Sequence, residues 1–240
     1  MKFTKVTKKV RKLIPVKYCG AVIVAAGNAS RMGGIDKVMA DIQGEPMIVK
    51  TVSKFQECDA VKEIVIVTRE DLIMPIMSLC AKFDKVKSVV LGGSCRTESV
   101  QAGLRMLSDR VQLAAIHDGA RPLITEQLID TVVRAANTYS AAAPGIPVKD
   151  TIKVVQGGVI QSTPDRSKLQ AVQTPQVFDI DLLKCALKAA QADGAELTDD
   201  CSAVERIGMS VKMVMGDEHN IKVTTPMDLK IAEMLLEDEK

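Results

Sequence analysis

Residues 22–37 read Val-Ile-Val-Ala-Ala-Gly-Asn-Ala-Ser-Arg-Met-Gly-Gly-Ile-Asp-Lys. The segment begins with apolar residues that do not alternate with polar ones, which is typical of a parallel strand buried on both faces. The loop that follows is rich in small residues, so its backbone N–H groups can approach a phosphate closely. Arg31 and Lys37 add two positive charges. The segment therefore predicts a buried strand whose carboxyl end leads into a polyphosphate-binding loop.

The loop differs from two common nucleotide-binding motifs. It has no Gly-Lys-Ser/Thr ending, so it is not a P-loop. Its Gly27-Asn28-Ala29 also breaks the Gly-x-Gly-x-x-Gly dinucleotide pattern. Phosphate binding is thus predicted in a loop of another kind.

Strand-like and helix-like segments alternate along the rest of the chain. The patterns predict strands at 20–25, 63–68, 87–91, 113–117, 141–147 and 211–215. They predict helices at 46–57, 71–81, 98–107, 126–136, 181–191 and 199–207, and a last helix that begins at Pro226 with Thr225 as N-cap. This alternation favours an α/β fold, a mostly parallel sheet with helices on both faces.

Residues 148–173 interrupt the alternation, because they contain no long amphipathic helix. They predict a protruding β-hairpin arm with Gly157-Gly158 near its turn. Such an arm has exposed strand edges that need to be covered.

Composition limits the classes of protein that fit. A chain of 240 residues with 47% hydrophobic and 26% charged residues is typical of a globular protein. Its apolar runs are too short for a membrane span or a signal-peptide core, so we expect a cytoplasmic protein without a membrane partner. Residues 1–18 form a basic N-terminal extension, and residues 19–240 are expected to be a single domain. Because the remainder has more acidic than basic residues, we expect the extension to be solvated rather than bound to nucleic acid.

Cysteines, histidines and aromatic residues narrow the chemistry further. The six cysteines form no Cys-x-x-Cys pair and there are two histidines, so we expect no zinc site and mostly reduced thiols. Aromatic residues make up 2% of the chain, which contains no tryptophan. A nucleobase is therefore expected to be selected by backbone amides and small polar side chains rather than by stacking.

Ala25-Ala26-Gly27, Arg31-Met32-Gly33 and Lys37 resemble the phosphate-binding loop of the sugar-phosphate and alditol-phosphate nucleotidyltransferases. Further similar blocks lie at 92–100, 117–122, 148–151, 165–166, 173–176, 197–200 and 220–224. Together they resemble the 2-C-methyl-D-erythritol 4-phosphate cytidylyltransferase family. The resemblance implies a Rossmann-like nucleotidyltransferase fold and transfer of the CMP group of CTP to methylerythritol phosphate, in the non-mevalonate route to isoprenoids. The attacking phosphate is already ionised, so catalysis needs positioning and positive charge rather than a general base.

The resemblance also implies roles for individual residues. The catalytic residues would be Arg31, Lys37, Arg166 and Lys222. The nucleotide-binding residues would be Ala25, Ala26, Gly27, Asn28, Gly93, Ser94, Arg96 and Ser99. The substrate-binding residues would be Asp118, Arg121, Thr151, Thr174 and Thr198, with Asp118 also the ligand of Mg²⁺. A homodimer is implied, in which residues 148–173 serve as the dimerisation arm and Arg166 reaches the partner's site.

Other interpretations remain open from the sequence. Lys222 could be a solvated strand lysine, Asp118 a helix cap, and Arg96 a scaffold residue. The loop before Lys37 is one residue shorter than is usual in the family, with Asp36-Lys37-Val38 in place of Pro-Lys-Gln. A ribitol-phosphate or other alditol-phosphate cytidylyltransferase is the nearest alternative. A nucleotide-binding regulator that has lost turnover is the alternative from another class.

Overall fold

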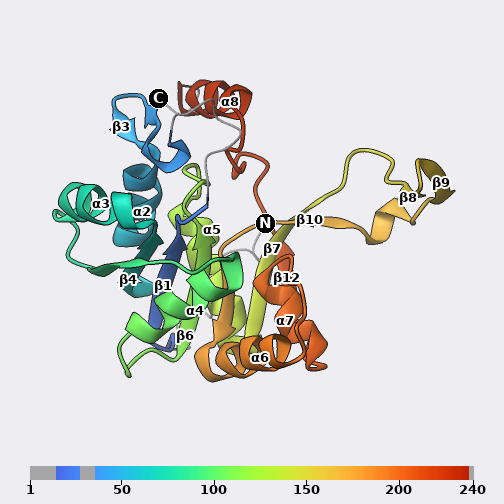
Figure 1. Cartoon of the computed structure of the whole chain (residues 1–240), viewed down its shortest axis with the longest axis horizontal. Coiled ribbons are helices and arrows are strands. Elements are labelled where there is room, and N and C mark those ends of the chain that lie inside the picture. The colour runs from blue at the N-terminus through green and yellow to red at the C-terminus, as the bar shows by residue number, and fades with distance from the viewer. Residues whose placement is uncertain (1–14, 28–35, 238–240) are drawn as a thin grey trace, which may run out of the picture.

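The central feature of the computed structural model is a twisted sheet with helices on both faces (Figure 1). The structure describes residues 15–27 and 36–237. Within them the main sheet has eight strands, in the order β10-β7-β11-β6-β1-β4-β5, with β12 beside β7. The strands are β1 (Cys19–Val24), β4 (Val61–Thr68), β5 (Val86–Leu91), β6 (Leu113–Asp118), β7 (Ala141–Pro147), β10 (Gln170–Val172), β11 (Gln176–Asp179) and β12 (Lys212–Met215). The predicted α/β fold with a mostly parallel sheet is confirmed.

The register of the central strands determines where loops emerge. Strand β1 is parallel to both of its neighbours, and Val24 at its end is paired with Val67 of β4 and with Asp118 of β6. Three strands therefore end at the same edge of the sheet. Side chains that follow them are brought together there.

Two layers of helices cover the sheet. Helices α2 (Met47–Glu57), α3 (Ile73–Cys80) and α5 (Glu126–Tyr139) pack on one face, and α4 (Arg96–Met106), α6 (Ile180–Ala192) and α7 (Asp200–Arg206) on the other. Ala21 and Ile23 of β1 contact the first layer, and Val22 contacts the second. The apolar run in residues 22–25 thus packs on both faces, as a buried parallel strand requires.

A third, smaller core lies above the carboxyl edge of the sheet. We call it the apical cluster, and its buried members are Ala40, Ile42, Met47, Ala120, Leu123, Val223 and Ala232. It joins α8 (Pro226–Glu237) to the short hairpin of β2 (Asp41–Ile42) and β3 (Glu45–Pro46). The backbone N–H of Val223 donates to the carbonyl of Ala120 at 2.9 Å. The cluster therefore ties together the segments that follow Lys37, Asp118 and Lys222.

The helices and strands predicted from the sequence are all present, with ends displaced by up to three residues. Helix α8 begins at Pro226, and the Asp228 N–H donates to Thr225 Oγ1 at 3.3 Å, which makes Thr225 its N-cap. The sequence did not predict β2, β3, β10 and β11. The last two are antiparallel to β7, and β11 separates it from β6.

The predicted arm is a hairpin of β8 (Val154–Gln156) and β9 (Val159–Ser162) that projects from the body of the protein (Figure 1). Gly157 and Gly158 form its turn with φ values of +57° and +79°, a conformation that glycine adopts without steric cost. Val155, Val159 and Ile160 are exposed on it. Residues 170–172, at the end of the expected arm, belong instead to β10 of the main sheet.

None of the helices in the described parts of the chain is long and apolar enough to cross a membrane.

Candidate active site

A cleft of about 480 Å³ opens at the carboxyl ends of the central strands. Its walls come from the loops after β1, β4, β5 and β6 and from the segment before α8. The predicted residues that line it are Ala25, Ala26, Gly27, Lys37, Gly93, Ser94, Arg96, Ser99, Asp118 and Lys222. The structure therefore brings most of the predicted nucleotide-binding residues together with two of the predicted catalytic ones.

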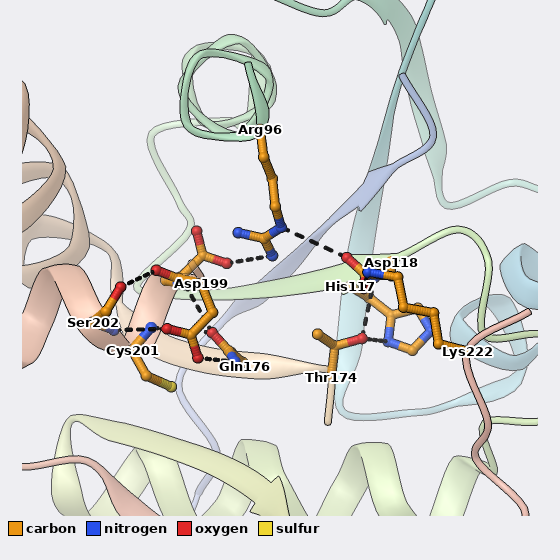
Figure 2. Close-up of polar contacts among 10 residues, drawn as sticks. Arg96, His117, Asp118, Thr174, Gln176, Asp199, Cys201, Ser202 and Lys222 are labelled. Atoms are coloured by element: carbon orange, nitrogen blue, oxygen red, sulfur yellow. Dashed lines mark hydrogen bonds and ion pairs between the residues drawn. The ribbon is translucent and has the colours of Figure 1, made fainter. Parts of the chain in front are cut away.

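Asp118 lies at the centre of a charged cluster in this cleft (Figure 2). Its Oδ2 is 2.7 Å from Lys222 Nζ, and its Oδ1 is 3.7 Å from Arg96 Nε. Burial alone would raise the pKa of Asp118, but the charges of Lys222 and Arg96 outweigh burial and lower that pKa to about 2. Asp118 is thus a carboxylate held between two cations. It does not cap α5, because Thr125 accepts the capping hydrogen bond there.

Arg96 joins this cluster to α7. Its Nη2 lies 2.7 Å from Oδ2 of the buried Asp200. Gln176 Oε1 accepts hydrogen bonds from the N–H groups of Asp200 and Cys201, at 3.0 and 3.1 Å. Burial raises the pKa of the Asp200 carboxyl, and the charge of Arg96 opposes that rise. Arg96 therefore lines the cleft and also ties α4 to the start of α7, as the scaffold interpretation requires, and its role in binding the nucleotide stays a prediction.

His117 and Thr174 support Asp118 from below (Figure 2). The Asp118 N–H donates to Thr174 Oγ1 at 3.1 Å, and that hydroxyl lies 3.0 Å from His117 Nδ1. Burial lowers the pKa of His117 to about 3, so the imidazole is neutral. If the hydroxyl donates to Nδ1, the ring proton is on Nε2 and points to the carbonyl of Arg121, 3.3 Å away. This chain of hydrogen bonds fixes the backbone at Asp118.

Arg121 is buried behind the cluster and does not line the cleft. Its Nη1 donates to the carbonyl of Asn220 at 2.6 Å, and Asn220 Nδ2 donates to the carbonyl of Thr174 at 3.0 Å. Arg121 Nε has no hydrogen-bond partner among the described residues. These contacts place the backbone two residues before Lys222 against Thr174.

The segment between β5 and α4 forms a narrow wall of the cleft. The Gly93 N–H donates to Ser99 Oγ at 3.1 Å, and the Ser99 hydroxyl donates to the carbonyl of Cys95 at 3.0 Å. A Cβ at Gly92 would lie 2.7 Å from the Cβ of Ala26, closer than two carbon atoms can approach. Glycine is therefore required where the two loops meet.

The remaining predicted site residues are either outside the described part of the chain or not among the residues that line this cleft. Asn28 and Arg31 are outside the described residues. Thr151 and Arg166 are exposed on the arm, where Arg166 Nη1 donates to the carbonyl of Lys149 at 2.6 Å. Thr198 is exposed just before α7. Thr174 supports Asp118 without lining the cleft.

The structure adds residues that the sequence analysis missed. Arg69 and Glu70 line the cleft and directly follow β4, so the carboxyl-edge rule applied to residues 63–68 could have found them. Three further residues do not line the cleft but contact residues that position its wall: His117, Gln176 and Asp200. They lie in the similar blocks at 117–122, 173–176 and 197–200, but the sequence analysis gave them no role, because their partners are distant along the chain.

The chain resembles known proteins over most of its length. The family model for 2-C-methyl-D-erythritol 4-phosphate cytidylyltransferase matches residues 19–238. A protein of that name from Symbiobacterium thermophilum is 46% identical over 220 residues, covering 91% of this chain and 92% of the relative. One from Caldanaerobacter subterraneus is 44% identical over 221 residues, covering 90% and 97%. The crystal structure of the 4-diphosphocytidyl-2C-methyl-D-erythritol synthase from Anaerococcus prevotii is 29% identical with a TM-score of 0.84, covering 92% of this chain and 96% of that one.

Proposed function

The chain belongs to the 2-C-methyl-D-erythritol 4-phosphate cytidylyltransferase family, and we propose that the cleft at the carboxyl edge of its sheet is where the reaction occurs. The enzyme transfers the CMP group of CTP to methylerythritol phosphate, giving 4-diphosphocytidyl-2-C-methyl-D-erythritol and pyrophosphate, a step of isoprenoid biosynthesis. The relatives favour this acceptor over ribitol phosphate.

The charged cluster of Asp118, Lys222 and Arg96 carries the assignment of the site. Transfer brings an anionic acceptor phosphate against an anionic triphosphate, so the barrier is lowered by fixed positive charge. Lys222 is held at the cleft by Asp118 and remains 43% exposed, which leaves its ammonium able to reach a phosphate. Lys37 faces the same space, and Arg31 is proposed to join it.

We place the cytosine between the loop after β1 and the segment before α4. Ala26 and Gly92 leave little room at this wall, and Gly93, Ser94 and Ser99 supply backbone and small polar groups. A flat pyrimidine fits such a wall without aromatic stacking. Arg121, Thr174 and Thr198 are proposed for the acceptor alcohol.

Mg²⁺ is the proposed cofactor, with Asp118 as its protein ligand. Among the described residues no group of three or more acidic, histidine or cysteine side chains could hold a metal alone. A single carboxylate still fits Mg²⁺, which is commonly held by one or two carboxylates with substrate phosphates and water. When bound, the ion would neutralise charge on the triphosphate. Asp118 would hold the ion, and Lys222 beside it would add its own positive charge at the phosphates.

A homodimer is the proposed assembly. The hairpin of β8 and β9 exposes Val154, Val155, Val159 and Ile160, which a second copy of the arm could cover. Arg166 and Thr151 do not line the cleft of their own chain, so we propose that the arm delivers them to the partner's site. A cytoplasmic location is also proposed, supported by six cysteines that all remain free thiols.

A pyrophosphate-release assay tests the function. Purified protein is given Mg²⁺ with CTP, UTP, ATP or GTP, and either methylerythritol phosphate or ribitol 5-phosphate. We expect release with CTP and methylerythritol phosphate, and much lower kcat/KM for the other combinations. Comparable turnover with ATP or GTP would refute the proposed base site, and preference for ribitol 5-phosphate would refute the proposed acceptor.

A further inference from the structure

An ion pair braces the wall of the cleft that carries Lys37. Arg69 directly follows β4 and precedes the short 3₁₀ helix η2 (Glu70–Leu72), and it lines the cleft. Asp36 directly precedes a second short 3₁₀ helix, η1 (Lys37–Met39). Arg69 Nη2 and Asp36 Oδ2 form an ion pair in which both side chains are partly buried. The pair therefore connects the loop after β4 to the segment that carries Lys37.

Asp36 uses both of its carboxylate oxygens. Oδ1 accepts a hydrogen bond from the Val38 N–H at 3.2 Å, which makes Asp36 the N-cap of η1, while Oδ2 contacts Arg69. Val38 is buried in the core between the sheet and the layer of α2, α3 and α5, and Ala40 is buried in the apical cluster. The backbone of η1 is thus fixed by packing after Lys37 and by the Asp36 contacts before it.

Arg69 is held from its other side by Asp71. Its Nε lies 3.2 Å from Asp71 Oδ1, and its Nη2 lies 3.0 Å from Asp71 Oδ2. The hydrogen bonds that Arg69 donates to Asp71 and Asp36 raise the pKa of Arg69 above its ordinary value. Two carboxylates therefore balance the charge of a single guanidinium, so Arg69 does not present an uncompensated positive charge to a triphosphate.

We infer that Arg69 and Asp36 are positioning residues, which hold η1 so that the ammonium of Lys37 meets the phosphates of CTP. This inference rests on the proposed phosphate-binding role of Lys37. It assigns Arg69 an indirect action although that side chain lines the cleft. Displacing a phosphate-binding lysine by about 1 Å is enough to lower turnover by roughly 10- to 100-fold.

A mutant cycle with Lys37 tests the inference. Arg69→Ala removes the brace, whereas Asp36→Asn keeps a capping oxygen for the Val38 N–H and removes only the charge. Each change is made in the wild-type chain and in Lys37→Ala, and kcat/KM for CTP and the melting temperature are measured. Arg206→Ala is the matched control, because this exposed arginine pairs with Asp193 away from the cleft.

The expected result is strong coupling. Lys37→Ala, Arg69→Ala and Asp36→Asn each lower kcat/KM for CTP by about tenfold or more. In the Lys37→Ala background the other two changes alter it by less than about twofold, since the residue they position is gone. Arg69→Lys restores part of the loss, because lysine can pair with Asp36 but cannot contact both carboxylates in the same way. Arg206→Ala has no effect.

Three other outcomes would overturn the inference in distinguishable ways. If the losses multiply in the Lys37→Ala background, Arg69 acts on the substrate or on the fold directly, and a matching fall in melting temperature would identify the fold. If Lys37→Ala itself keeps normal kcat/KM, the proposed role of Lys37 fails and the inference fails with it. Normal activity of Arg69→Ala and Asp36→Asn beside an impaired Lys37→Ala would remove the inference alone.

Discussion

At the scale of single residues, Lys222 has two partners in the proposed reaction. It pairs with Asp118 in the protein alone, and we expect it to face the phosphates when CTP and Mg²⁺ are bound. Lys222→Ala should therefore lower kcat by on the order of 10²-fold, the usual effect of removing one group that stabilises developing charge. We expect the same of Arg31→Ala. Steady-state kinetics beside thermal unfolding measures both effects.

The matched control for Lys222 is Lys212→Ala. Lys212 stacks over Tyr139, away from the cleft. Its removal should leave kcat unchanged. Asp118 still has Arg96 beside it after Lys222→Ala, so the melting temperature should change little. A loss of kcat that follows loss of folded protein would contradict the catalytic role.

The lowered pKa of His117 predicts that the stability of the protein depends on pH. The ordinary histidine pKa is 6.5, and burial lowers that of His117 to about 3, so between these values the unfolded chain binds a proton that the folded chain does not. The free energy of unfolding should fall as pH decreases through this range, by about 1.4 kcal/mol per pH unit once pH is well below 6.5. Urea unfolding at intervals from pH 7 to pH 4.5 measures the slope. This window lies above the pKa of Asp118.

The comparison for this slope is His117→Gln against His219→Gln. The chain has only these two histidines, and His219 is exposed. We expect the first change to flatten the dependence on pH and the second to preserve it, whatever either does to stability at pH 7. An unchanged slope in His117→Gln would mean that other groups take up the proton.

Single residues also show how far sequence reasoning reached. The resemblance of short blocks placed Asp118 and Lys222 in one site although 104 positions separate them, because each block is recognisable by itself. Arg69 lies in none of these blocks, and Asp200 lies in the block 197–200 but was given no role. Their roles follow from which loop lies beside which, and the sequence alone did not determine that geometry at the level of side chains.

At the scale of elements, α4 packs against the sheet at Gly103 with no room for a side chain. A Cβ at Gly103 would lie 2.3 Å from Val22 Cγ1 and 2.9 Å from Val67 Cγ2. Gly103→Ala should gain about 1 kcal/mol of helix propensity and lose about 1–3 kcal/mol to overpacking, because branched valines in a sheet cannot move aside easily. We expect net destabilisation and a raised KM for CTP, since α4 begins at Arg96.

Chemical denaturation and CTP titration measure these two effects. Arg105→Ala, on the exposed side of the same helix, is the matched control and should change neither quantity. A Gly103→Ala protein with unchanged stability and KM would show that α4 can shift outward without moving its first turn.

The elements that sequence patterns missed share a physical cause. Strand β11 has four residues and β10 three, too short for a periodic signal. Val172 of β10 pairs with Gly145 of β7, and Val177 of β11 pairs with Ala142 of β7. Between these two pairs the chain that joins β10 to β11 has four residues, whereas β7 has two. The extra length contains Thr174, which supports Asp118. The longer helices and strands were predictable because their apolar periodicity follows from packing on one sheet.

At the scale of the whole molecule, the proposed role of the arm predicts that two inactive variants restore activity when they are mixed. If Arg166 serves the partner's site, a mixture of Arg166→Ala and Lys222→Ala chains should regain activity, because a heterodimer contains one site free of both changes. Activity after subunit exchange measures this, with each inactive homodimer alone as the control. Exchange without recovery would confine Arg166 to its own chain, and a monomer by sedimentation at working concentration would remove the premise.

The apical cluster has a consequence for the order in which parts of the protein can fold during synthesis. Every strand of the main sheet lies between Cys19 and Met215, whereas Lys222 and α8 come later. A chain still attached to the ribosome can therefore pair its strands and bury both large cores before its cleft has Lys222. Activity would begin only when α8 has left the exit tunnel and packed over the loops that carry Lys37 and Asp118. Completion of the apical cluster would then be the event that switches the enzyme on.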